Sequence, residues 1–129
     1  QVNFSYKETF DFSKKLIMNN PDMKALWLQG SDKYQGALDA MAELGKSDEI
    51  LLICFDSEPE FLQMIPEGKL VGAAMQQPFL MGEKSVEQFY NHFNNIKIEK
   101  NIKLEILAVS KENIDTKLKT IKQNVLGIK

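Results

Sequence analysis

The chain has 129 residues, of which 43% are hydrophobic and 26% charged, and this suits one globular domain with an ordinary core. The 16 basic and 18 acidic side chains give a net charge of −2, so no basic excess attracts phosphate backbones and we expect no nucleic-acid binding. A single cysteine excludes an internal disulfide, and no apolar stretch reaches the roughly 20 residues that span a bilayer.

The first half of the chain alternates predicted helices and strands. Hydrophobic spacing predicts a helix over residues 6–19 and then a short apolar strand over 23–29. Ser31 is a good N-cap for a second helix that ends at Gly45. Residues 49–55 form a continuously apolar run, which is typical of a parallel strand covered on both faces.

The second half continues this alternation. Ser57 and Glu60 have the spacing of a capping box, which predicts a short helix ending near Gly68. A strand follows over residues 70–76, and Pro78 begins a long helix. Four large apolar side chains of that helix share one face: Val86, Phe89, Tyr90 and Phe93.

The end of the chain completes the pattern with a strand over residues 102–109 and a helix that begins near Asn113. This order predicts an α/β fold in layers, with a mostly parallel sheet and flanking helices. In such sheets, ligands bind beyond the carboxyl ends of the strands. Asp56, Gln76 and the turn that starts at Gly30 all follow predicted strands, so we expect them at that edge.

Asp56 has two interpretations at this position. An acidic residue after a strand can simply shape the turn or cap the next helix. Because Ser57 supplies a hydroxyl for the predicted cap, Asp56 is left available to hold a ligand. The spacing alone favours neither interpretation.

Six short motifs follow one another along the chain: Asn20-Pro21, Gly30-Ser31, "GALDA" at 36–40, "CFD" at 54–56, "IPEGKL" at 65–70, and Gln76-Gln77-Pro78 followed by Gly82. In this order and at this spacing they resemble the C-terminal half of type 1 periplasmic sugar-binding proteins. The similarity covers residues from about 3 to 113. The resemblance implies the C-terminal part of a bilobal fold. Residues 1–76 and 110–129 would belong to the second lobe, and 77–109 would form a hinge crossing and a segment of the first lobe.

The resemblance also implies roles for individual residues. Asp56 matches a carboxylate that accepts hydrogen bonds from two sugar hydroxyls, and Gln76 matches a hinge amide that donates to and accepts from the sugar. The family's asparagine in the turn after the first strand is Gly30 here, which leaves Ser31 or Asp32 as the residues to replace it. We therefore expect a ligand site formed by Asp56, Gln76, Gly30, Ser31 and Asp32.

The function implied is non-enzymatic recognition of a sugar or similar small polar solute, outside the cytoplasm, for an ABC transporter permease or a sensor protein. An alternative is the cytoplasmic effector domain of a lactose-repressor-like transcription regulator, which has the same pocket chemistry. An enzyme that uses Asp56 as base or nucleophile is disfavoured, because the acidic pair and the lysine of phosphoacceptor domains are missing. We also expect a homo-oligomer, because the apolar face of the helix from Pro78 has no partner in the chain.

The remaining residues that could act in catalysis or binding are better interpreted as structural residues. His92 has no nucleophile or carboxylate constellation around it, and one cysteine with one histidine makes a zinc site unexpected. We expect no metal and no cofactor. Cys54 in an apolar strand is interpreted as a small hydrophobe, and Trp27, in the middle of a strand, as a core residue.

Overall fold

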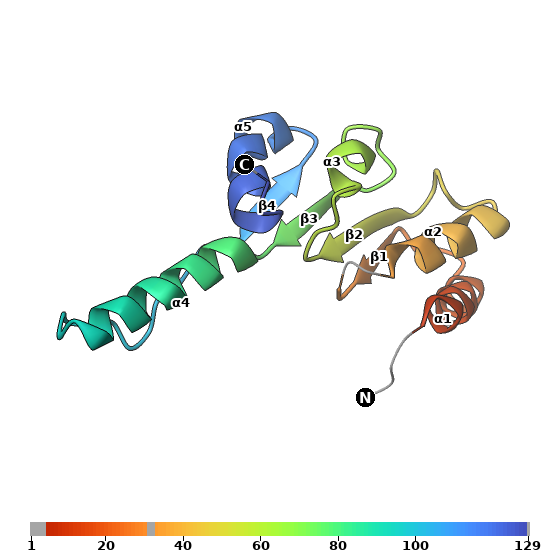
Figure 1. Cartoon of the computed structure of the whole chain (residues 1–129). Helices are drawn as coiled ribbons and strands as arrows, with labels where there is room; N and C mark the ends of the chain where they lie inside the picture. The colour runs from red at the N-terminus through yellow and green to blue at the C-terminus, as the bar shows by residue number, and fades with distance from the viewer. Residues whose placement is uncertain (1–4, 31–32, 129) are drawn as a thin grey trace.

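The computed structural model describes residues 5–30 and 33–128, and the elements follow the predicted alternation (Figure 1). In chain order they are α1 (Tyr6–Asn19), β1 (Ala25–Leu28), α2 (Tyr34–Glu43), β2 (Leu51–Phe55), α3 (Phe61–Met64), β3 (Gly72–Met75), α4 (Pro78–Phe93), β4 (Leu107–Ser110), α5 (Ile114–Thr120) and the π-helical turn η1 (Ile121–Val125). No helix in the described ranges is long and apolar enough to cross a membrane.

The four strands form one sheet in the order β1-β2-β3-β4. The first three are parallel, and β4 returns antiparallel to β3. The α/β fold with a mostly parallel sheet is thus confirmed. The register pairs Leu28 with Cys54 and Phe55 with Ala74, so the chain leaves β1, β2 and β3 at the same edge.

The core lies on one face of the sheet. Alternate strand residues, among them Leu52, Cys54 and Met75, join one buried cluster with side chains from α2, α3 and α5. On the opposite face Leu51 is 51% exposed and Trp27 is 60% exposed. The predictions that Trp27 is a core residue and that 49–55 is covered on both faces are therefore wrong, because the described chain supplies no element that covers the second face.

Helices α1 and α2 pack closely together at Gly36. A Cβ added at this glycine would lie 2.8 Å from the carbonyl oxygen of Tyr6 and 3.1 Å from the backbone nitrogen of Phe10, both in α1. The absence of a side chain thus permits the close approach of the two helices. Helix α1 begins with a capping box between Ser5 and Glu8, in which each side chain bonds the other's backbone N–H.

The capping box predicted at Ser57 and Glu60 does not form. Helix α3 begins at Phe61 without a side-chain cap, and the Ser57 hydroxyl donates instead to the Glu58 carbonyl at 3.4 Å. The chain after β2 makes a turn first, with the Phe61 N–H bonded to the Glu58 carbonyl at 3.0 Å. The sequence analysis inferred that Asp56 is available for a ligand because Ser57 caps the helix. Since Ser57 makes no such cap, this inference no longer has a basis.

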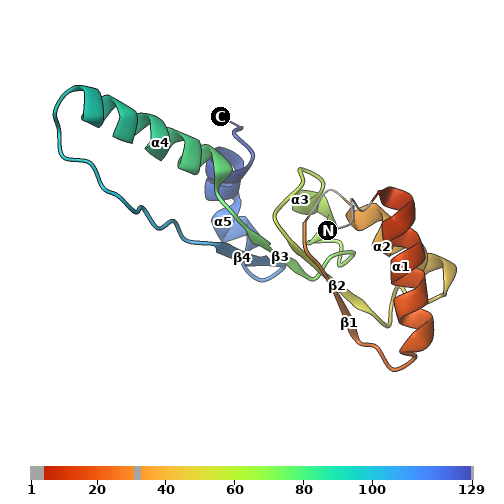
Figure 2. The ribbon, with the colours of Figure 1, turned by 90° about the horizontal axis from the view of Figure 1, so that it is seen from below.

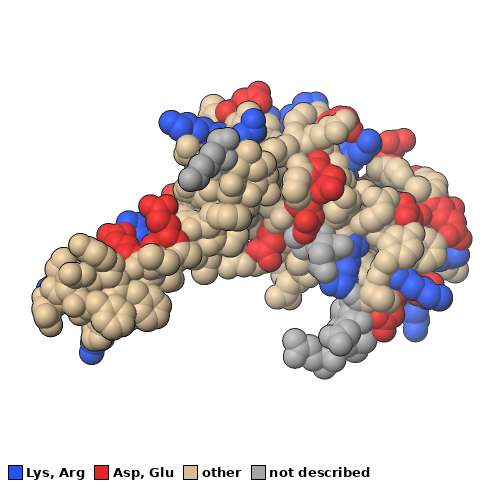
Figure 3. Space-filling view, viewed as in Figure 1, with Lys and Arg blue, Asp and Glu red and all other residues tan. Residues whose placement is uncertain are grey.

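Helix α4 projects from the body of the molecule, and residues 96–106 run back beside it (Figures 1 and 2). No residue of α4 is buried, and among the described elements only η1 makes extensive contact with it. The predicted strand at 102–109 is shorter than expected, because pairing with β3 begins only at Leu107. We call α4 and residues 96–106 together the arm; its far end is largely uncharged in Figure 3.

Candidate functional site

Asp56 lies immediately after β2 in a left-handed backbone conformation. Its φ is +68°, and its N–H donates to the carbonyl of Ala74 on β3 at 2.9 Å. Aspartate tolerates this conformation better than most residues other than glycine, because its short polar side chain can bond locally. The turn holds the half-buried carboxylate at the carboxyl edge of the sheet, as the sequence predicts.

Gln76 lies next to Asp56, because it follows β3 at the same edge. Its Nε2 donates to Asp56 Oδ1 at 2.7 Å, and both residues are partly buried. A carboxylate has about four acceptor positions, so this bond leaves Asp56 able to accept from further donors. The Gln76 amide oxygen is an acceptor, and the pair therefore combines acceptors and an oriented donor in one place.

The turn after β1 approaches the same edge. Gly30 comes two residues after Leu28, just as Asp56 comes two residues after Cys54, the parallel partner of Leu28. Gly30 has a φ of +97°, a conformation that glycine adopts without the steric cost paid by other residues. Ser31 and Asp32, the other predicted site residues, lie outside the described residues.

Gln77 is a structural residue that the sequence analysis did not single out. It is only 6% exposed, and its Nε2 donates to the Glu105 carbonyl at 2.7 Å. Its Oε1 accepts from Asn124 Nδ2, also at 2.7 Å. Gln77 therefore connects the start of α4 to the segment that precedes β4 and to η1. The sequence signal for this role was the pair of glutamines before Pro78. Side chains of consecutive residues point to opposite sides of an extended chain, so the two glutamines face different partners.

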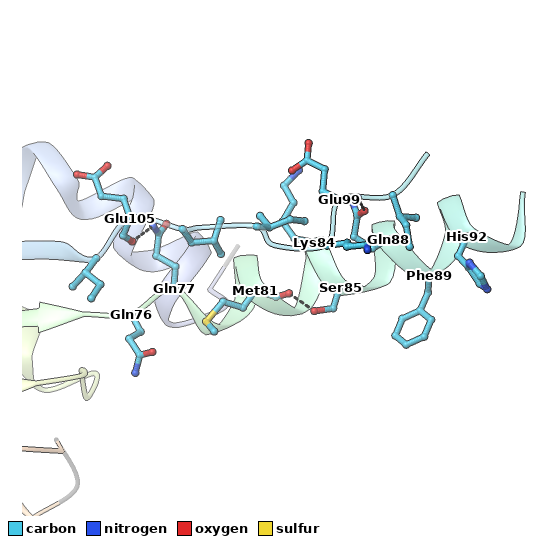
Figure 4. A pocket seen from close by; sticks show the side chains of 15 residues that line it. Gln76, Gln77, Met81, Lys84, Ser85, Gln88, Phe89, His92, Glu99 and Glu105 are labelled. Atoms are coloured by element: carbon cyan, nitrogen blue, oxygen red, sulfur yellow. Dashed lines mark hydrogen bonds between the residues drawn. The ribbon is translucent and has the colours of Figure 1, made fainter. Parts of the chain in front are cut away.

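A groove of about 650 Å³ lies between α4 and the returning segment (Figure 4). Gln76 and Gln77 lie at its base, and its walls are mainly apolar, with Met81, Phe89 and Ile102 among them. The groove therefore adjoins the Asp56–Gln76 pair: Gln76 lines it and Asp56 does not.

Cys54 is buried beneath this site and is 0% exposed. Burial raises the pKa of its thiol to about 12, so the thiolate is scarce at neutral pH. We predict that Ellman's reagent at pH 8 leaves the folded protein unmodified and reacts with one thiol per chain in urea. Rapid reaction of the native protein, followed by absorbance, would contradict the burial of this residue.

The described residues contain no group of three or more His, Cys, Asp or Glu side chains that can hold a metal ion. His92 is exposed on α4, as expected, and its ring contacts that of Phe93. Carboxylate and amide groups are thus the polar chemistry of the Asp56 site. They suit hydrogen bonding to a neutral polyhydroxyl compound.

Comparison with known proteins identifies relatives along most of the chain. The family model for the periplasmic binding protein domain matches residues 3–97. The ribose import binding protein of Escherichia coli strain K12 is 28% identical over 111 residues, which is 86% of this chain and 37% of that protein. The chain thus spans little more than a third of this relative.

Solved structures agree with the fold. A carbohydrate transporter solute-binding protein from Agrobacterium radiobacter, in complex with D-arabinose, is 25% identical with a TM-score of 0.77, over 92% of this chain and 41% of that one. An ABC transporter solute-binding protein from Actinobacillus succinogenes with bound D-allose has a TM-score of 0.80 at 18% identity, over 88% and 40% of the two chains. The second comparison supports the fold alone.

Proposed function

This chain belongs to the periplasmic binding protein domain family, and on that premise we propose that it recognises a sugar or a similar small polar solute. The observation that supports the proposal best is the bond of 2.7 Å between Gln76 Nε2 and Asp56 Oδ1 at the carboxyl edge of the parallel strands. The ribose import binding protein and the solute-binding protein in complex with D-arabinose make a monosaccharide the first class to test.

The proposed chemistry follows from the two side chains. Vicinal sugar hydroxyls each donate one hydrogen bond, and the two oxygens of the Asp56 carboxylate accept them as charge-assisted bonds. The Gln76 amide keeps the carboxylate in place and offers its own oxygen to a third hydroxyl. We propose that Gly30, Ser31 and Asp32 complete the site. At position 30 recognition has to use backbone groups, since glycine has no side chain.

The arrangement in two lobes is part of the proposal. Residues 1–76 and 110–129 would form part of one lobe, and 77–109 would be the hinge crossing and a segment of the other. The projection of the arm away from the sheet supports this division (Figure 2).

We further propose an extracytoplasmic protein whose partner is an ABC transporter permease or a sensor. A homo-oligomer is proposed as well, because Val86, Phe89, Tyr90 and Phe93 are 63% to 78% exposed.

The test is a titration followed by NMR, with D-ribose, D-allose, D-arabinose and D-galactose added to the labelled chain. We expect Kd values of about a millimolar or weaker, roughly 4 kcal/mol of binding, since a cleft ligand in this family is held from two lobes. The Asp56 amide and the Gln76 side-chain NH₂ signals should shift together with at least one sugar.

Two variants sharpen this titration. Gln76→Ala should remove the shifts, because it deletes the amide that contacts both Asp56 and the solute. Gln88→Ala is the matched control: its Oε1 accepts from the Glu99 N–H at 2.9 Å in the arm, away from Asp56. Shifts confined to α4 and residues 98–106, or no shift at tens of millimolar of any of the four sugars, would refute the proposal.

A further inference from the structure

A π-helical turn near the end of the chain faces the start of α4. In η1 the Leu126 N–H donates to the carbonyl of Ile121 at 3.0 Å, a bond from residue i+5 to residue i that a regular α-helix does not make. Ile121 and Val125 are buried in the core, so the turn is fixed to the body of the molecule. Asn124 comes just before Val125 and directs its side chain to Gln77. The turn therefore holds Asn124 on a rigid support.

A backbone carbonyl determines which way two side-chain amides point. The Glu105 carbonyl can only accept a hydrogen bond, so it faces Nε2 of Gln77, at 2.7 Å. The Oε1 atom of Gln77 then faces Asn124, which donates from Nδ2, also at 2.7 Å. If either amide turned over, two acceptors would meet at a place where Gln77 is only 6% exposed. The part of Asn124 in this network is thus to donate one hydrogen bond.

The same network holds the backbone beside the proposed solute site. Since no residue of α4 is buried, the hydrogen bonds of Gln77 and the contact with η1 are what fix the start of this helix. The side chains of Gln76 and Gln77 point to opposite sides of the chain in Figure 4. Gln76 donates to Asp56 Oδ1 at 2.7 Å, so a change of backbone direction at Gln77 moves the Gln76 amide relative to that carboxylate.

Stability alone does not require polar side chains in this network. Replacing both partners of a buried hydrogen bond by apolar groups of the same shape is often nearly neutral for stability. A buried polar network whose members are all paired differs in that it selects one geometry, because each donor has to meet its own acceptor. The amides of Gln77 and Asn124 are therefore better explained by a need to fix a direction than by a need for stability.

We propose that Asn124 is a positioning residue for the solute site and that it acts through Gln77. With the donor at 124 in place, the backbone of residues 76 and 77 keeps one conformation, and the Gln76 amide stays directed at Asp56. Without that donor Gln76 samples several directions, and the solute loses a partner that is oriented before binding. The expected effect on affinity rests on the proposed function, whereas the order of the Gln76 side chain is measurable without any sugar.

Asn124→Asp tests the donor, because it keeps the shape of the side chain and places an acceptor oxygen against Gln77 Oε1. In ¹⁵N relaxation the order parameter of the Gln76 side-chain NH₂ group should fall below about 0.6. The Kd for the sugar that binds best should rise about fivefold to tenfold. Asn20→Asp is the matched control: its Nδ2 also donates to a carbonyl, that of Leu16 at 2.8 Å, but it precedes β1, toward the amino ends of the parallel strands. It should change neither quantity.

A double variant separates positioning from stability, and it also serves if Asn124→Asp does not fold. Gln77→Leu combined with Asn124→Leu removes both amides, so part of the stability lost in Gln77→Leu alone should return. The order of Gln76 and the sugar affinity should nevertheless stay as low as in Gln77→Leu, whereas a purely structural role predicts that they recover with stability. Wild-type order of the Gln76 NH₂ group in Asn124→Asp or in the double variant would overturn the inference. Failure of the wild type to bind any sugar refutes the proposed function instead, and the order of Gln76 still decides this inference.

Discussion

Asp56→Asn is expected to reduce sugar affinity more than a hundredfold while the thermal midpoint stays nearly unchanged. A hydrogen bond to a charged group contributes about 1.5–3 kcal/mol, and Asp56 is proposed to accept two from the sugar. Asparagine keeps the shape, tolerates the positive φ of +68°, and still offers an oxygen to Gln76 Nε2. The loss therefore reports the negative charge and the second acceptor oxygen together, and not the shape of the side chain. Because the wild-type Kd is expected near a millimolar, such a loss leaves no shift at tens of millimolar of the sugar that binds best in the NMR titration, and thermal unfolding is followed by circular dichroism.

A second variant separates binding from turn geometry. Asp56→Gly removes the carboxylate but relieves the left-handed backbone, so the protein should be as stable as the wild type or more stable, and still fail to bind. Asp56→Ala is less informative, because alanine in this conformation costs about 1–2 kcal/mol. If Asp56 only shapes the turn, Asp56→Asn will bind sugar normally, and the proposed role will be wrong.

The elements with strong periodicity were predictable from the sequence. Helix α1 matches the predicted range of 6–19, and α4 begins at Pro78 as predicted. Because β2 and β3 are adjacent and parallel, the residues that follow them meet at one edge, and this brings Asp56 and Gln76 together. Their direct hydrogen bond was not predicted, since it depends on the positive φ at Asp56, which the residue type permits but does not require.

Burial was harder to predict than secondary structure. Trp27 and Leu51 are apolar strand residues, and the sequence pattern is the same whether one face of the sheet or both faces are covered. Which face is covered depends on other elements, and α2, α3 and α5 all pack against the opposite side. The shortened β4 has a similar cause. Residues 102–106 have a strand pattern, but no adjacent strand is there to complete the ladder.

The cap predicted at Ser57 shows the limit of local motifs. A serine three residues before a glutamate satisfies the pattern in two places, and only Ser5 and Glu8 form the box. After β2, the positive φ of Asp56 and the ring of Pro59 direct the chain through a turn before the helix starts. The backbone bond from Phe61 to Glu58 takes the place of a side-chain cap.

Gln77→Leu is expected to lower the free energy of unfolding by about 2–3 kcal/mol. The substitution removes two hydrogen bonds of a buried side chain, and it leaves the Glu105 carbonyl and the Asn124 amide without that partner. Each such bond is worth about 1 kcal/mol net, and unsatisfied buried partners add to the cost. In the variant, the half-buried Asn124 amide and the carbonyl of the exposed Glu105 regain some hydrogen bonds to water, so we expect the loss of stability to lie near the lower end of this range. Urea unfolding measures the change.

Gln76→Leu is the matched control, because it is the same substitution one residue earlier in the chain. Gln76 bonds only the partly exposed Asp56, so the stability loss should stay below about 1 kcal/mol while sugar binding disappears. Adding Asn124→Leu to Gln77→Leu should recover part of the lost stability, since the unpaired amide is then removed as well. Equal losses for Gln76→Leu and Gln77→Leu would contradict this division, in which Gln76 is proposed to contact the solute and Gln77 fastens the arm to η1.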